Sequence, residues 1–193
     1  MGKITRESLM SLEAYARERS AFRARVMAHK QRRKVDLGPN VMVQFEDELT
    51  MRYQVLEMLR AERIFEQAGI EEELDAYNPL VPDGRNFKAT MMIEYPDPAQ
   101  RGRALQQLIG IEDRVWLQVG DAPKVWAIAD EDLERETHEK TSSVHFLRFE
   151  LDDQMIRALK TGAPLSMGID HARYQAGIKV TAETRDALLE DLQ

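Results

Sequence analysis

The chain has 193 residues, of which 43% are hydrophobic and 32% are charged, and it carries a formal net charge of −7 and no cysteine. This composition is typical of a globular protein, and we expect one domain over residues 1–193. Without cysteine, the chain can form neither disulfides nor thiolate-held iron–sulfur clusters. The negative charge argues against nucleic-acid binding as a main function, because phosphate neutralisation needs a basic surface.

The chain shows no sign of a membrane or secretory segment. No apolar run approaches the roughly 20 residues that a membrane helix requires, and the first residues, Met1 to Glu7, lack the apolar stretch of a secretory signal. We therefore expect a cytoplasmic protein that does not bind membranes.

Residues 1–33 are expected to form an amino-terminal helical part, because apolar residues recur there at helical spacing. The segment from Arg17 to Lys34 contains eight Lys or Arg residues against one acid, Glu18. Such a segment is usually a solvated helix face, but it can also dock on an acidic partner or, less readily, on nucleic acid. The candidate partner-binding residues are Arg23, Arg25, Lys30, Arg32 and Arg33.

The remainder, residues 34–193, is expected to be rich in antiparallel sheet, which gives an α+β fold. Alternating apolar residues and turn residues predict strands and hairpins. These are a hairpin over 34–45, a strand over 87–95, a hairpin of 114–119 with 124–129, a strand over 143–151, and a hairpin of 165–169 with 178–180.

Helix starts in this part follow from side chains that can cap a helix. The residues that suit this role are Asp97, followed by Pro98, then Asp130, Asp152 and Thr181. As a cap, Asp130 predicts a short acidic helix that runs through Arg135.

A long central helix is predicted between Leu49 and Ala68, and its apolar residues lie nearly all round the helix axis. It should therefore be buried, although Glu57 and Arg60 interrupt it and buried charges need partners. Tyr53 lies four residues before Glu57, and Arg60 lies three residues after it, so the three side chains can meet. The network is structural, or it lines a cavity with Tyr53, Glu57 and Arg60 as candidate catalytic residues.

His145 lies on the apolar face of the predicted 143–151 strand, where a histidine is usually a hydrogen-bonded core residue. The alternative is that it meets glutamates to bind Fe, Mn or Zn, because imidazole and carboxylate groups suit these ions. The candidate metal ligands are Glu57, Glu62 and His145. The candidate residues for binding an anionic or other small ligand are Arg60, Glu94 and Arg148.

Five stretches of the sequence resemble an uncharacterised bacterial family, the DUF3501-like domains of unknown function: residues 22–30, 57–62, 73–79, 110–120 and 141–150. Members of that family are typically encoded near a rubrerythrin-like protein and an iron–sulfur oxidoreductase. The resemblance therefore implies a role near peroxide defence or electron transfer, and it supplies no catalytic residues.

Two functional hypotheses follow. The first is an accessory or adaptor protein whose basic segment, Arg17 to Lys34, binds a redox partner such as a rubrerythrin-like or iron–sulfur protein. The alternative is a metal-binding or small-ligand-binding enzyme that uses the buried Tyr, Glu, Arg and His side chains. Either is compatible with a homo-oligomer.

Overall fold

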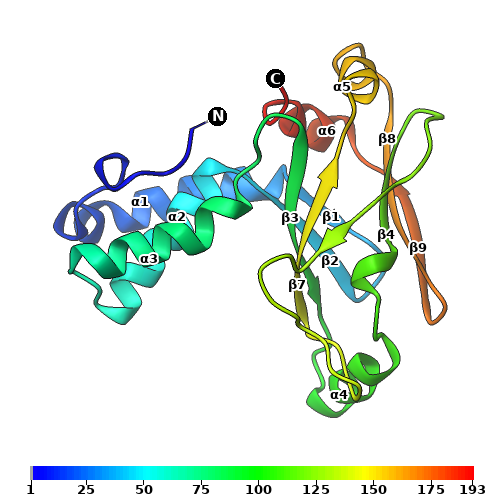
Figure 1. Cartoon of the computed structure of the whole chain (residues 1–193), viewed down its shortest axis with the longest axis horizontal. Coiled ribbons are helices and arrows are strands. Elements are labelled where there is room, and N and C mark those ends of the chain that lie inside the picture. Colours follow the sequence, from blue (N-terminus) through cyan, green and yellow to red (C-terminus); the bar gives the residue numbers. More distant parts are fainter. Residues whose placement is uncertain (1) are drawn as a thin grey trace.

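In the computed structural model, which describes residues 2–193, three helices form an arm that extends from a β-rich body (Figure 1). A short helix, η1 (Arg6–Ser8), precedes α1 (Leu12–Gln31), and α2 (Glu48–Glu62) is followed by α3 (Gln67–Tyr77). Helix α2 packs against both α1 and α3, so the predicted amino-terminal helical layer includes residues well beyond 33.

The helix predicted between Leu49 and Ala68 is shorter than expected, because the backbone at Arg63 adopts the left-handed conformation with φ of 56° and ends α2. One side of α2, with Met51, Val55 and Leu59, packs against Leu74 of α3. Its other side packs against α1. These two packed sides explain why apolar residues lie nearly all round α2.

The body consists of two antiparallel sheets, which confirms the α+β fold and four of the five predicted strand regions in outline. The first has the order β1 (Lys34–Asp36), β2 (Val41–Glu46), β3 (Asn86–Ile93), β7 (Val144–Glu150) and β6 (Ile128–Ala129). The second has the order β5 (Val125–Trp126), β4 (Val115–Val119), β8 (Leu165–His171) and β9 (Tyr174–Lys179).

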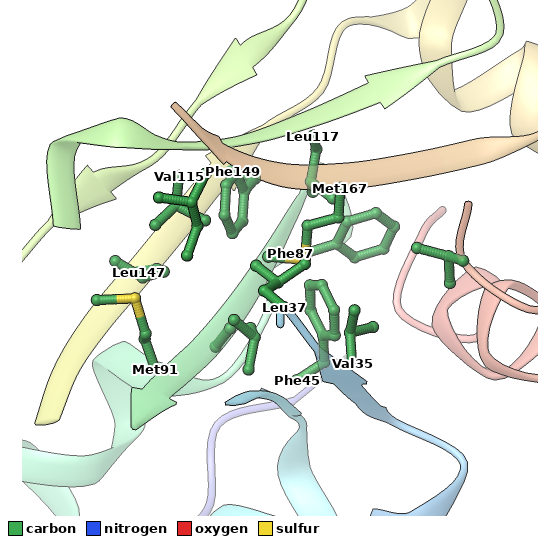
Figure 2. Packing of buried hydrophobic residues seen from close by; sticks show 14 of the residues in the cluster. Val35, Leu37, Phe45, Phe87, Met91, Val115, Leu117, Leu147, Phe149 and Met167 are labelled. Carbon is green, nitrogen blue, oxygen red and sulfur yellow. The ribbon is translucent and has the colours of Figure 1, made fainter. Parts of the chain in front are cut away.

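The main core lies between these sheets, and apolar side chains from both of them meet there (Figure 2). Phe45 and Phe87 of the first sheet make an edge-to-face contact with ring centroids 5.8 Å apart. Leu117 and Met167 of the second sheet are fully buried in the same cluster. The burial of aromatic and aliphatic side chains from every long strand holds the two sheets together.

Three further helices border the body: α4 (Pro98–Gln107), α5 (Asp153–Lys160) and α6 (Ala182–Leu189). Their predicted caps are confirmed, because Asp97, Asp152 and Thr181 each accept a backbone N–H bond from the first helical turn. Two short 3₁₀ helices, η2 (Asn78–Leu80) and η3 (Glu112–Arg114), complete the fold. Over residues 2–193, no helix is both long and apolar enough to cross a bilayer.

The region around residues 124–135 differs from its prediction. Strand β5 pairs with β4, as expected, but β6 pairs with β7, so the chain passes from one sheet to the other at Ala127. No helix forms over 130–135, because Asp130 has a left-handed backbone with φ of 49° and donates its N–H to the carbonyl oxygen of Phe146. The side chain that was expected to cap a helix is thereby turned toward β7.

Candidate metal centre

His145 is fully buried in β7 and is held by a carboxylate on one side of its ring. Its Nδ1 lies 2.6 Å from Oδ2 of Asp130. The other oxygen of Asp130 accepts the backbone N–H of Phe146 at 2.9 Å and a bond from Arg135 at 3.3 Å. Because an ionised carboxylate can only accept hydrogen bonds, Nδ1 of His145 carries a proton.

The opposite ring nitrogen, Nε2, faces three oxygen atoms. It lies 2.9 Å from Oγ1 of Thr141, 3.1 Å from the carbonyl oxygen of Ser142 and 3.8 Å from Oε2 of Glu112. Oγ1 of Thr141 and Oε2 of Glu112 are 3.4 Å apart. Within residues 2–193, Glu112, Asp130 and His145 are the one group of acidic, His or Cys residues whose ligand atoms lie close enough together to share a metal ion, all within 4.8 Å.

Glu112 is placed by η3, directly before β4, and is only 5% exposed. Burial removes water from its carboxylate and raises the pKa of Glu112 above its ordinary value, and the nearby carboxyl group of Glu136 raises that pKa further. Glu136 is held in turn by the backbone N–H of Gly110, at 3.0 Å. The Nε2 side of His145 thus faces the carboxyl group of Glu112, which has a second carboxyl group, that of Glu136, as its own neighbour.

The charge balance differs between the two sides of the ring. Arg135 compensates Asp130, and its guanidinium group lies 4.6 Å from the centre of the Phe146 ring. Apart from His145 itself, no cationic side chain of residues 2–193 pairs with Glu112 within 4.0 Å. A positive species beside Nε2, either a proton or a metal ion, would balance the charge there.

The predicted site around Glu57 is arranged differently from what was expected. Glu57 accepts bonds from the hydroxyl group of Tyr15 and from Nε of Arg19, both at 2.7 Å, and from Nη2 of Arg19 at 2.6 Å. The bidentate arginine holds the pKa of Glu57 down, at about 2. Arg60 is exposed, and Tyr53 packs against Phe22, so the predicted Tyr53, Glu57 and Arg60 network does not form.

The other predicted ligand residues do not share a pocket with His145. Glu62 lies at the exposed end of α2, and Glu94 is exposed just beyond β3. Arg148 is bonded by Glu131 and Glu150. Arg148 lies opposite Lys88 of β3. Glu94 comes six residues after Lys88, so it lies about 20 Å from Arg148 along the strand. Of the three predicted metal ligands, only His145 belongs to the cluster.

The predicted partner-binding residues divide into exposed and buried ones. Arg23, Arg25 and Arg32 are exposed, and Lys30 is half-buried with its Nζ 3.9 Å from Glu46. Arg33 is fully buried at the root of the arm, which corrects the expectation that it binds a partner. Its guanidinium group donates to the carbonyl oxygen of Ala187 at 2.8 Å and pairs with Asp191, whose pKa burial raises to about 7.

The partners of His145 could not be predicted from the spacing of residues in the sequence. Glu112 occupies one turn of 3₁₀ helix before a strand, and Asp130 and Thr141 lie near the two ends of a segment without helix or strand. The spacing of apolar residues therefore could not indicate that these side chains meet. The signal that existed was a histidine on an apolar strand face, which requires polar partners from elsewhere in the chain.

The fold and the cluster define an α+β protein with a buried centre of one histidine and several carboxyl groups. The chain belongs to the DUF3501 family, described as proteins of unknown function, whose family model matches residues 3–192. It is similar to a crystal structure of a novel protein of unknown function from Burkholderia pseudomallei K96243, with 55% identity, a TM-score of 0.95 and full coverage of both chains. No curated protein matches the chain.

Proposed function

We propose that this protein binds one divalent transition-metal ion, Mn²⁺, Fe²⁺ or Zn²⁺, through Nε2 of His145 and the carboxylate of Glu112. The observation that carries the proposal is the convergence on Nε2 of Oγ1 of Thr141 at 2.9 Å, the carbonyl oxygen of Ser142 at 3.1 Å and Oε2 of Glu112 at 3.8 Å. With a ring proton on Nδ1, Nε2 offers a lone pair to a cation that lies among these oxygens.

The distances suit a cation with modest adjustment. Two ligand atoms that are each about 2.1 Å from a tetrahedral ion lie about 3.4 Å apart. Nε2 of His145 and Oε2 of Glu112 are 3.8 Å apart, so a contraction of a few tenths of an ångström suffices. The hydroxyl group of Thr141, close to both atoms, is a third donor within reach.

The types of ligand narrow the choice of ion. One imidazole nitrogen with carboxylate, hydroxyl and carbonyl oxygens favours Mn²⁺, Fe²⁺ or Zn²⁺ over soft ions, which prefer sulfur. Asp130 would act as an orienting residue, because a carboxylate on Nδ1 fixes the tautomer and raises the basicity of Nε2. Its own bonds to Phe146 and Arg135 keep it in place.

Thermal unfolding of metal-free protein, with and without added MnCl₂ or ZnCl₂, tests this proposal. A ligand that binds only the folded state at 100 times its Kd stabilises it by about 2.7 kcal/mol. We expect a clear rise in Tm for the native sequence, none for Glu112→Gln or His145→Gln, and a 10-fold to 100-fold weaker affinity for Asp130→Asn.

His171→Gln is the matched control, because His171 lies in β8 outside the cluster and contacts the carbonyl oxygen of Ile109. It should respond to metal like the native sequence. An equal response in Glu112→Gln, or no response to either MnCl₂ or ZnCl₂ in the native sequence, would contradict the proposal and leave His145 as a hydrogen-bonded core residue.

A second candidate function is docking on a partner protein, in line with an accessory role in a cytoplasmic redox or peroxide-defence module. The observation in its favour is that Arg23, Arg25 and Arg32 are exposed on or next to α1 and have no carboxylate partner within 4.0 Å among residues 2–193. Unpaired exposed arginines can meet an acidic surface.

Salt dependence tests this docking with a purified rubrerythrin-like protein as the probe. Binding through exposed arginines should weaken as ionic strength rises through about 0.15 M, where charges are screened beyond about 8 Å. The triple variant Arg23→Ala, Arg25→Ala, Arg32→Ala should bind more weakly, whereas Arg173→Ala, at an exposed turn of the body, should not. Salt-insensitive binding, or none, would remove this candidate.

A further inference from the structure

The free end of the arm presents the most exposed large hydrophobic side chain in residues 2–193, Phe65, which is 68% exposed. It lies in the short connection between α2 and α3, just after the left-handed turn at Arg63. A phenylalanine costs free energy when it is left in water, and single exposed apolar residues are common. What distinguishes Phe65 is the surface next to it.

Phe65 is one of the residues that line a hollow of about 470 Å³ between the start of α1, the end of α2 and the start of α3. The apolar side chains that line the hollow belong to Leu9, Met10, Leu12, Leu59 and Ile70. Arg6, Glu7 and Glu13 also border it, so the rim carries both signs of charge. The arm tip therefore has an apolar projection and an apolar recess side by side.

We propose that the arm tips of two copies of this chain form a twofold dimer in which Phe65 of each copy enters the hollow of the other. A projection beside a recess on one surface is self-complementary, because a twofold axis brings each to face its counterpart. The contact between Phe65 and the hollow is then made twice in each dimer. A different partner would use only one of the two features.

Charge and shape both favour a second copy as the occupant. Arg6 of one copy can pair with Glu7 or Glu13 of an inverted copy, so the charges that line the hollow can be matched across a twofold contact. The arm also extends away from the β-rich body, so the two bodies lie outside a tip-to-tip contact (Figure 1). This surface is separate from the exposed arginines of α1 and from the centre at His145, and the inference does not depend on metal binding.

Sedimentation equilibrium or light scattering over about 1 to 100 μM measures the dimer directly. Since each dimer contains two Phe65 contacts, Phe65→Ala should weaken association by about 100-fold or more. Leu133→Ala is the matched control, because Leu133 is also a large exposed apolar residue, at 56%, but lies in the body. It should dimerise like the native sequence.

A second variant tests the reciprocal geometry. Met10→Arg places a charge in the hollow and leaves Phe65 intact, so it should be monomeric while its helix content and Tm stay close to native. A mixture of Phe65→Ala and Met10→Arg restores one of the two contacts and should give a weak heterodimer. A native protein that is monomeric throughout this range, a Phe65→Ala variant that still dimerises, or a mixture without heterodimer would each overturn the proposal.

Discussion

Two partly or fully buried carboxylates, Glu57 in the arm and Glu112 in the body, have opposite surroundings. Glu57 receives three short hydrogen bonds, two of them from one arginine, and its pKa is lowered to about 2. Glu112 faces a histidine at 3.8 Å and a threonine hydroxyl at 3.4 Å, and its pKa is raised.

The difference separates a carboxylate that an arginine neutralises from one that has no arginine or lysine partner among residues 2–193. A bidentate arginine satisfies the charge and the lone pairs of Glu57 and ties α1 to α2. Glu112 is more deeply buried and lacks such a partner within the described chain, and this is the usual condition of a ligand-binding carboxylate. Burial alone therefore does not point to a functional residue, whereas burial without a compensating cation is the ground on which Glu112 is proposed as a metal ligand.

The largest effect is expected from replacing Arg33 at the root of the arm, because its positive charge balances Asp191 in a fully buried ion pair. Arg33→Met leaves Asp191 without its cation and also removes a cation 3.5 Å from Asp47. Breaking a buried pair on one side costs about 3 to 5 kcal/mol. Urea unfolding should show this loss of free energy, and a loss below about 1 kcal/mol would mean that the pair contributes little.

A smaller effect is expected from Glu57→Gln, about 1 kcal/mol, because the ion pair with Arg19 is partly exposed. The folded pKa of Glu57, about 2, lies below its ordinary value of 4.5. The stability that its charge provides is therefore present above pH 4.5 and is lost as the pH falls toward 2.

The difference in unfolding free energy between the native sequence and Glu57→Gln should accordingly shrink as the solution is acidified. Glu62→Gln serves as the control on the same helix, because Glu62 is exposed. A constant difference across this pH range would show that the charge of Glu57 is not what stabilises the arm.

The smallest effect, and the one of opposite sign, is expected from Glu112→Gln in metal-free protein. Removing a charge that burial disfavours should leave the unfolding free energy unchanged or raise it by up to about 1 kcal/mol. Urea unfolding beside Glu57→Gln measures the contrast. A loss as large as that of Glu57→Gln would mean that Glu112 is a satisfied structural residue.

Much of the fold could be predicted where local chemistry decides. The hairpin over 34–45 follows from alternation around its turn, and α4, α5 and α6 follow from Asp97, Asp152 and Thr181 as caps. Asp130 carries the same capping chemistry, yet the contact with His145 and the backbone pairing with Phe146 decide its conformation. Long-range contacts overrode a local preference there.

The candidate centre could be predicted only in part. His145 was identified because a strand pattern placed it on an apolar face, and the structure confirms that position. Its partners lie 15 and 33 residues away along the chain, at Asp130 and Glu112. The pairing of β6 with β7 brings Asp130 to His145, and the packing of the two sheets brings Glu112 there. Glu57 of α2 has its partners on α1, because the neighbouring helix provides bonds that spacing within one helix could not reveal.

Metal content per chain tests the central claim most directly. Untagged protein is produced in cells supplied with iron and manganese, purified without chelator and analysed by plasma mass spectrometry. We expect close to one Mn, Fe or Zn ion per chain in the native sequence and in Glu57→Gln, and almost none in Glu112→Gln. Metal-free native protein that also fails to take up these ions on dialysis, or equal metal content in all three proteins, would contradict the account.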